Sequence, residues 1–549
     1  MSDARRRAAA DPPATPPMAW APIAILGAAQ FVMVLDSSVM NVSISQIVAD
    51  LDTTIQGVQL AITAYTLVMA AFMLAGAKLG DILGRERTFA IGLAVYGAGS
   101  LTTALSPNLG VLLFGWSLVE GLGAAMVMPA IVSLIAGIYS GAQRALAFGI
   151  VGGVAGAAIA AGPLIGGWVT TELSWRYVFA AEVVIVIGVL LLRGKLRAAP
   201  ATVAGHPRLD GVGVLLSSLG LGLIVFGILK SSEWGLIEPR GALTIDGREI
   251  TPFGFSAVPF LMLAGGAFLA AFVIWEDRRE RAGRDTLLDR RLLRIPVLRA
   301  GLATLLIQQL VLLGTFFVLP VYLQVILGLD AFETGKKLFP MSVAMFVAAM
   351  AGPRLAAGLA PKRVAQVGLL ALAGASVLML GTIDVTLDDL EFAIALAVFG
   401  VGAGLLLSQL GNVIMSSVEP AQTNEAGGLQ GTAQNLGASL GTALIGAVLI
   451  AALSNGLVER VERNPAISPE VAEEVVKIAG GTTPIVPVEQ VESAAQEAGV
   501  PPAEAKALAD DYGEAQLHGL ERALGAVGLF ALLGLWFTRG LPARTARAD

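Results

Sequence analysis

The sequence has no cysteine, only two histidines and few charged residues. Without cysteine the chain can form no disulfide, no thiolate metal site and no cysteine nucleophile. His206 and His518 both lie outside the long apolar runs, which argues against a histidine-ligated metal centre. Charged residues make up 14% of the chain, whereas soluble domains carry roughly 25%. We therefore expect no bound metal and no other cofactor, in a chain that is not a soluble globular protein.

Long apolar runs dominate the chain instead. Of its 549 residues, 55% are hydrophobic, and the mean hydropathy is +0.75. A run of about 20 apolar residues is long enough to cross a bilayer as a helix. The sequence predicts an all-α polytopic membrane protein with about fourteen such spans, which are centred near Met33, Met69, Ala94, Ala124, Ala157, Ile187, Leu221, Ala264, Val311, Val347, Leu372, Ala397, Leu440 and Phe530.

The distribution of positive charge predicts the orientation. Lys and Arg gather in alternate short loops, as at Arg85, Arg193 and Lys362, and such loops face the cytoplasm. Residues 1–18 and 541–549 are then cytoplasmic tails, the first of them polar, rich in Pro and Ala, and expected to be disordered. The first apolar run is too long for a signal peptide. We expect a multi-pass protein of a bacterial-type inner (plasma) membrane with both termini in the cytoplasm.

An internal repeat divides the chain. Gly76, Leu79 and Arg87 recur in the second half, and so do glycines from the stretch that begins at Gly149, at nearly the same spacing: Gly352, Leu355, Arg363, Gly428, Gly431, Gly441 and Gly446. Repeated halves with a substrate path between them are common in secondary transporters.

The repeat predicts two six-helix halves, residues 19–197 and 297–540, which flank two inserted transmembrane helices with an outer hairpin loop in residues 209–276. The second half contains a long outer loop, residues 455–516. This loop is either a small helical cap or a solvated connector.

The loop AKLGDILGRER resembles the cytoplasmic motif between spans two and three of the major facilitator superfamily. Asp81, Gly84, Arg85 and Arg87 match that motif. The resemblance implies that these residues form a conformational gate between inward-open and outward-open states. A carboxylate beside guanidinium groups at helix ends can be paired and released as the helices shift.

Two more stretches are similar to the fourteen-span drug:proton antiporter branch of that superfamily. GAAIAAGPLIGG resembles its fifth-span antiporter motif, with Gly162, Pro163, Gly166 and Gly167 in place. The first span, VLDSSVMNVSISQI, carries Asp36 and Asn41 of the first-span motif. The family's tryptophan-arginine pair at the outer end of the fifth and sixth spans is present as Trp175 and Arg176.

Departures from the branch at three positions of the fourth and sixth spans change the charge inside the membrane, and the loop motif itself departs at Ala77, Ile82 and Glu86. The fourth span usually has an arginine and a glutamine where this chain has Ser117 and Glu120, and an asparagine is usual where Glu182 stands. A mechanism that uses the fourth-span arginine therefore cannot be transferred. Two additional carboxylates appear where the family pattern is neutral.

The carboxylates are the candidate coupling site. An ionised side chain near the bilayer centre costs about 2.5–3.5 kcal/mol, so such residues tend to mark ion paths. We expect Asp36, Glu120 and Glu182, with Asn41, to take part in proton coupling or substrate binding, and a cationic substrate could compete with the proton. The alternatives are that Asp36 caps a broken helix and that Glu182 forms a salt bridge with Arg176 or with a neighbouring helix.

Amide side chains in the second half are possible cavity-lining residues. They are equally compatible with hydrogen bonds that hold helices together. The candidates are Gln308, Gln309, Gln409, Asn412, Gln434 and Asn435.

The chain lacks the sequence signatures of an enzyme, such as a P-loop or an HExxH motif. We expect a monomeric, proton-coupled exporter of amphipathic or cationic organic solutes, with small-molecule substrates, protons and the lipid bilayer as partners and no nucleic acid. One alternative is export of an endogenous lipid, siderophore or secondary metabolite. Another is a membrane scaffold or receptor that does not transport.

Overall fold

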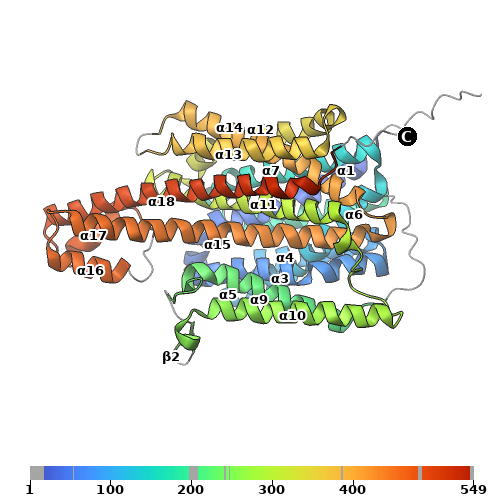
Figure 1. Ribbon diagram of the computed structural model, residues 1–549, viewed down its shortest axis with the longest axis horizontal. Helices are drawn as coiled ribbons and strands as arrows, with labels where there is room; N and C mark the ends of the chain where they lie inside the picture. The colour runs from blue at the N-terminus through green and yellow to red at the C-terminus, as the bar shows by residue number, and fades with distance from the viewer. Residues whose placement is uncertain are drawn as a thin grey trace, which may run out of the picture.

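The computed structural model describes residues 18–53, 55–196, 208–239, 243–245, 248–384, 387–479 and 485–543. Long helices run side by side along one axis of the molecule (Figure 1). Disorder was expected of residues 1–18, of which residues 1–17 lie outside the described residues, as do residues 544–549 of the predicted C-terminal tail. The apolar runs form helices because a helix satisfies its own backbone hydrogen bonds in lipid.

The first group of helices precedes the insertion. α1 packs on α7 and α8, α4 packs on α6 and α8, and α3 packs on α6. The bounds are α1 Trp20–Val42, α2 Ile44–Asp50, α3 Ile55–Leu83, α4 Arg85–Ala104, α5 Leu109–Leu112, the π-helix η1 Leu113–Glu120, α6 Gly121–Ile138, α7 Gly141–Glu172 and α8 Arg176–Leu192.

The second group follows the insertion. α12 packs on α14, α13 on α14 and α18, and α11 on α15 and α18. The two groups meet where α7 contacts α12 and α14, and where α15 contacts α3 and α6. The bounds are α11 Pro296–Pro320, the π-helix η5 Val321–Ile326, α12 Ala331–Gly358, α13 Pro361–Leu380, α14 Asp389–Ser416, α15 Thr423–Arg463, α16 Pro469–Ala479, α17 Val488–Glu497 and α18 Pro502–Phe537.

The insertion consists of α9 (Gly211–Trp234) and α10 (Ala257–Arg281), which pack against each other. α9 also contacts α3 and α15. Between the two helices, β1 (Leu243–Ile245) and β2 (Arg248–Ile250) form an antiparallel pair in which Leu243 lies opposite Ile250.

Twelve helices or helix runs of the described residues are long and apolar enough to cross a membrane. α4 and α12 are not among them, although they are 20 and 28 residues long and pack within the bundle. The count of about fourteen spans, like the boundaries of the two halves, therefore stays a prediction.

α15 and α18 extend beyond the other helices and carry α16 and α17 at their far end (Figure 1). These four elements share a small hydrophobic core of their own, which includes Leu457, Val461, Leu508 and Tyr512. The described residues of segment 455–516 thus form a helical unit. We call this end of the molecule the cap end. The opposite end, where α1 begins and α18 ends, is called the tail end.

Candidate functional site

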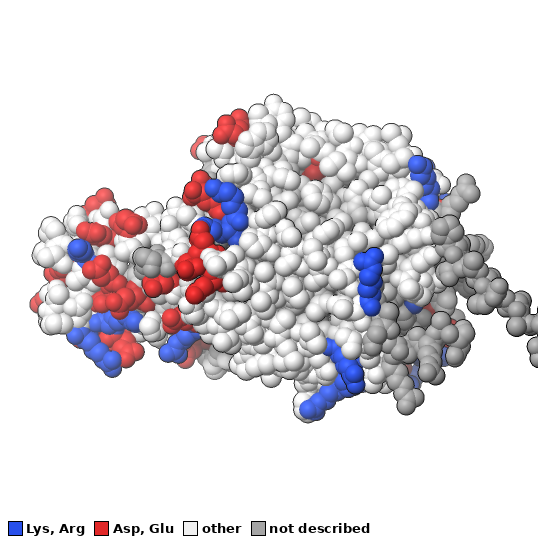
Figure 2. Space-filling view, turned by 90° about the horizontal axis from the view of Figure 1, so that it is seen from above, with Lys and Arg blue, Asp and Glu red and all other residues white. Residues whose placement is uncertain are grey.

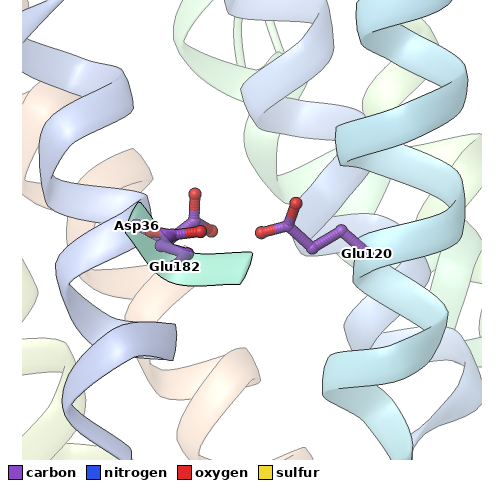
Figure 3. Close-up of side chains that lie close together, drawn as sticks. All are labelled: Asp36, Glu120 and Glu182. Atoms are coloured by element: carbon purple, nitrogen blue, oxygen red, sulfur yellow. The ribbon is translucent and has the colours of Figure 1, made fainter. Parts of the chain in front are cut away.

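Three carboxylates meet inside the first group of helices. Asp36 is on α1, Glu120 is the last residue of η1, and Glu182 is on α8. One oxygen from each lies within 4.8 Å of the others, and the side chains point toward one another (Figure 3). Their exposed fractions are 0%, 0% and 1%. The sequence named each residue but could not place them together.

Donors surround two of the three carboxylates. Trp116 Nε1 donates to both Asp36 oxygens at 2.9 and 3.0 Å. Ser100 Oγ donates to Glu182 at 3.2 Å, and the Tyr96 hydroxyl lies 3.5 Å from the same oxygen. Neither Glu120 oxygen has a hydrogen-bond partner among the described residues.

The described residues supply no cation to this cluster, because no ion pair involves it. Arg176, the expected alternative partner of Glu182, instead pairs with Asp50 at 2.9 Å. Asp36 lies within α1 rather than at a helix break. The alternative roles suggested for Asp36 and Glu182 therefore do not describe this arrangement. Three carboxylates at this spacing could hold protons or a single cation.

Close packing of α4 holds η1 and Glu120 in place. A Cβ on Gly99 would lie 2.6 Å from the Glu120 backbone nitrogen, so a side chain there would force the two helices apart. A π-helix adds a residue to the helical turn and is frequent at functional sites. From the sequence, residues 113–120 are indistinguishable from the rest of an apolar span.

The fifth-span motif packs α7 against α1 beside the cluster. A Cβ on Gly162 would lie 1.9 Å from Ser38 Oγ, and one on Gly166 would lie 2.8 Å from Val39 Cγ2. Gly167 is also buried. The side chains of Pro163 and Asn41 lie outside the described residues. Small residues thus let the two helix backbones approach closely.

The predicted gate residues join the two groups of helices at the tail end. Asn424 donates to Asp81, and Arg85 donates to Pro420 O at 2.7 Å and Thr423 Oγ1 at 2.6 Å. Gly84 has a φ of +90°, which favours glycine. Arg87 is exposed.

Further tail-end contacts were missed in the sequence. Lys78 lies 3.4 Å from Glu425 and 3.7 Å from Asp81. Arg144 Nε donates to Asn412 at 3.1 Å, and its Nη2 donates to Ser416 at 2.5 Å. Lys78 lies three residues before Asp81, so the two side chains share one face of a helix. This spacing could have indicated the Lys78 contact from the sequence.

Trp175 and Arg176 close the other end of the first group. Trp175 Nε1 donates to Asp50 at 3.0 Å, and the Arg176 guanidinium lies 4.4 Å from the Trp175 ring centroid. Partial burial raises the pKa of Asp50, but the hydrogen bonds that it accepts and the charge of Arg176 outweigh this effect and hold the pKa below its usual value.

A cavity of about 80 Å³ lies between the two groups, and its amide side chains are Gln30, Gln430 and Gln434. Gln434 was among the predicted lining residues, whereas Gln30 and Gln430 were not. The other predicted amides do not line this cavity. Asn412 binds Arg144, Gln409 donates to Ser408 Oγ at 3.0 Å, and Asn435 donates to the Gly431 carbonyl at 3.0 Å.

Gln308 and Gln309 do not line the cavity either. Gln308 is fully buried, and neither of its amide atoms has a partner among the described residues. The Gln309 Cβ would lie 3.0 Å from a Cβ placed on Gly437 of α15. Gln309 is therefore a helix-contact residue.

A family model settles the classification. The model of the Major Facilitator Superfamily matches residues 26–442. The chain belongs to this superfamily. It is therefore a multi-pass membrane transporter and not an enzyme, as the sequence predicted.

The relatives are efflux and export proteins. The chain is 30% identical to the "Probable actinorhodin transporter" of Streptomyces coelicolor, over 80% of this chain and 74% of that protein. It is 26% identical to the "Tetracenomycin C resistance and export protein" of Streptomyces glaucescens, over 95% and 91%. It is 27% identical to the "Multidrug efflux pump LfrA" of Mycolicibacterium smegmatis, over 80% and 82%. The similarity to drug-efflux members of the superfamily is thereby confirmed.

A solved structure supports the fold. The human organic anion transporter MFSD10 (TETRAN) matches with a TM-score of 0.57 at 12% identity, over 95% of this chain and all of that chain.

Proposed function

We propose that this efflux transporter is a proton-coupled antiporter of amphipathic organic solutes, and that Asp36, Glu120 and Glu182 hold the coupling protons. The observation that carries the proposal is a buried group of three carboxylates without a cationic partner among the described residues. Unpaired buried charge is costly, and proton uptake removes that cost. Proton binding and release thereby favour different states of the carrier.

Alternating access uses the contacts between the two groups of helices. In this proposal, Asp81, Arg85, Lys78 and their partners on α15 hold the tail end closed, and release of these contacts opens it. The cavity between the groups is the site that becomes accessible from each side in turn.

The charge distribution supports the proposed orientation. On the face shown in Figure 2, acidic side chains gather at the cap end, and Lys and Arg predominate toward the tail end. Basic ends face the cytoplasm. We place both termini in the cytoplasm and count α4 and α12 as spans, which gives fourteen.

A second candidate cargo is an endogenous secondary metabolite. It is favoured by relatives that are named as transporters or exporters of actinorhodin, tetracenomycin C and cephamycin. A scaffold without transport activity would have no use for paired contacts between two mobile groups.

Proton release from energised inside-out vesicles tests the proposal. A panel of uncharged, cationic and anionic amphipathic solutes is added while a fluorescent probe reports the pH gradient. The proposal expects solute-dependent collapse of the gradient, and loss of that response in Asp36→Asn, Glu120→Gln or Glu182→Gln. Folded protein that gives no response to any solute would refute proton antiport.

A further inference from the structure

We infer that the central cavity binds uncharged solutes through the amides of Gln30, Gln430 and Gln434, and that the carboxylate cluster does not bind the solute directly. This inference rests on the proposed function and adds the class of substrate. It replaces the idea, raised in the sequence analysis, that a cationic substrate competes with the proton for the same carboxylates.

The lining of the cavity is neutral. Its seventeen described lining residues include no acidic or basic side chain, and all of them except the three glutamines are apolar or glycine. A lipophilic cation would lose its hydration there without gaining a counter-charge, which is unfavourable. The cavity of about 80 Å³ is smaller than the roughly 150 Å³ that holds a benzene ring, so binding requires the two groups of helices to move apart. An uncharged ring system with carbonyl or hydroxyl groups would then gain apolar contacts together with hydrogen bonds.

The glutamines face the cavity from both groups of helices. Gln30 is on α1, and Gln430 and Gln434 are one turn apart on α15. Gln430 is 5% exposed, and its Oε1 has no partner among the described residues. A buried amide oxygen without a partner costs free energy until a donor binds it. A hydroxyl group on the solute would provide that donor.

The nearest charged side chains on the lining helices are already engaged. Arg144 lies one turn before the lining residue Phe148 and binds Asn412 and Ser416. Glu425 lies two residues before Gly427 and is held by Lys78 and by the Asp289 backbone N–H. Neither side chain lines the cavity.

The carboxylate cluster is separated from the cavity along the helices. Asp36 is six residues beyond Gln30 on α1, which corresponds to about 9 Å. Glu120 is eight residues before Met128, the first α6 residue of the lining, which corresponds to about 12 Å. The hydrogen bonds of the cluster come from Trp116, Tyr96 and Ser100, all within the first group of helices.

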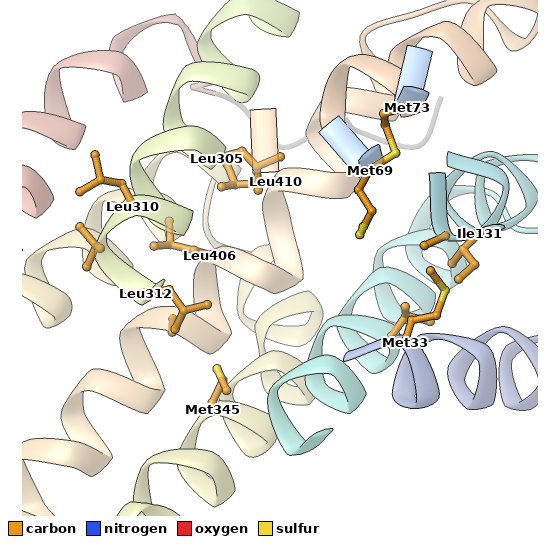
Figure 4. Close-up of a cluster of buried hydrophobic side chains, with 14 of the residues drawn as sticks. Met33, Met69, Met73, Ile131, Leu305, Leu310, Leu312, Met345, Leu406 and Leu410 are labelled. Atoms are coloured by element: carbon orange, nitrogen blue, oxygen red, sulfur yellow. The ribbon is translucent and has the colours of Figure 1, made fainter. Parts of the chain in front are cut away.

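Apolar side chains around the cavity can adapt to different rings. Of the side chains labelled in Figure 4, Ile131, Leu305 and Leu410 line the cavity, whereas Met33, Met69 and Met73 do not. The methionine of the described lining is Met128. Methionine side chains are flexible and polarisable, and they repack around varied ligands. Specificity then depends on the positions of the amides and not on a charge.

A matched pair of ligands tests the inference. One is an anthraquinone with a neutral hydroxyethyl arm, and the other is the same ring with a trimethylammonium arm. Their affinities are measured with the purified full-length protein at one pH, with proton release measured in parallel vesicles. We expect the wild type to bind the neutral ring at least tenfold more tightly. Equal or tighter binding of the cation would overturn the inference.

Substitutions locate the binding. Gln430→Leu and Gln434→Leu are each expected to weaken binding of the neutral ring about fivefold, which corresponds to the loss of one ordinary hydrogen bond. Asn435→Leu is the matched control, because that amide bonds its own helix backbone, and its affinity should match the wild type. Gln434→Glu should reverse the preference in favour of the cation. Unchanged affinity in both leucine variants would contradict the inference.

The cluster variants separate this inference from the proposed function. Glu120→Gln should abolish proton release and keep the wild type's preference for the neutral ring over the cation, because indirect coupling through η1 changes both affinities together. Loss of that preference in this variant would show direct binding by the cluster and overturn the inference. If the wild type released no protons while Gln430→Leu and Gln434→Leu still weakened binding of the neutral ring, proton coupling would be refuted. The inferred substrate class would not be affected.

Discussion

Glu120 differs from its neighbours because neither of its carboxylate oxygens has a partner among the described residues. Asp36 accepts a hydrogen bond from Trp116, and Glu182 accepts one from Ser100. An ionised Glu120 would therefore lack the hydrogen bonds that its two neighbours have. We propose Glu120 as the carboxylate that takes up and releases the coupling proton.

Substitution of Glu120 should separate transport from stability. Glu120→Gln keeps the shape and removes the charge, so we expect at least a tenfold loss of proton-coupled transport with no fall in the thermal midpoint. Vesicle assays and thermal unfolding of the purified protein give the two values. The exposed Glu391→Gln serves as the control. A marked fall in the midpoint would mean that Glu120 is a structural residue.

Asp50 should give the fold a measurable pH dependence. Its pKa is lower in the folded protein, so its ion pair with Arg176 stabilises the fold above the unfolded value of about 4, and this contribution is lost as the pH falls through the folded pKa. We expect Asp50→Asn to cost about 1 kcal/mol at neutral pH, because the pair is partly exposed.

Thermal unfolding across pH tests the Asp50 prediction. The difference in stability between the wild type and Asp50→Asn should shrink toward zero in acid. If the stability difference stays constant from neutral to acidic pH, it does not come from the charge of Asp50.

At the scale of elements, η1 connects the cluster to the cavity, because α6 continues from it and contributes Met128 and Ile131 to the cavity lining. A change of protonation that shifts η1 would also shift these lining residues. This gives a physical route for indirect coupling between proton and solute.

The contact of α4 with η1 should not tolerate a side chain. A Cβ on Gly99 would collide with the Glu120 backbone, so Gly99→Ala should destabilise the protein by about 3 kcal/mol, the upper end for overpacking. Gly188→Ala on α8 is the control, since a Cβ there meets no atom within 4 Å. Equal thermal midpoints for the two variants would show that η1 can move away freely.

For the whole molecule, the tail-end contacts should control the balance between open and closed states. The chain has no cysteine, so Ala142→Cys and Leu359→Cys introduce two spin labels on exposed positions of α7 and the α12–α13 loop. Arg85→Ala removes hydrogen bonds to Pro420 O and to Thr423 at the start of α15, together with one to Ser133 O of α6. We expect pulsed electron paramagnetic resonance to show a larger population of long distances between the two spin labels in this variant than in the wild type.

Arg87→Ala is the control for that measurement, because Arg87 is exposed and has no hydrogen bond or ion pair among the described residues. Its distance distribution should match the wild type. A shift of equal size in both variants would point to the net charge of the tail end and not to the Arg85 contacts.

The sequence predicted the architecture better than the site. Apolar runs and motifs were enough for the helices and the superfamily, because lipid permits few alternatives to a helix. They could not bring Asp36, Glu120 and Glu182 together, since that depends on how three helices pack. Gln30 and Gln430 were missed for the same reason. For Asn412 the sequence left two roles open, and its hydrogen bond with Arg144 of α7 matches the helix-contact alternative.

The most direct test of the account is uptake driven by a pH gradient alone. Purified protein is reconstituted into liposomes, a gradient is imposed without a membrane potential, and accumulation of a labelled solute is followed for the wild type and for Glu120→Gln. The account predicts accumulation against the solute gradient in the wild type and none in the variant, although the variant still exchanges solute at equilibrium. Accumulation that persists in Glu120→Gln would contradict the account.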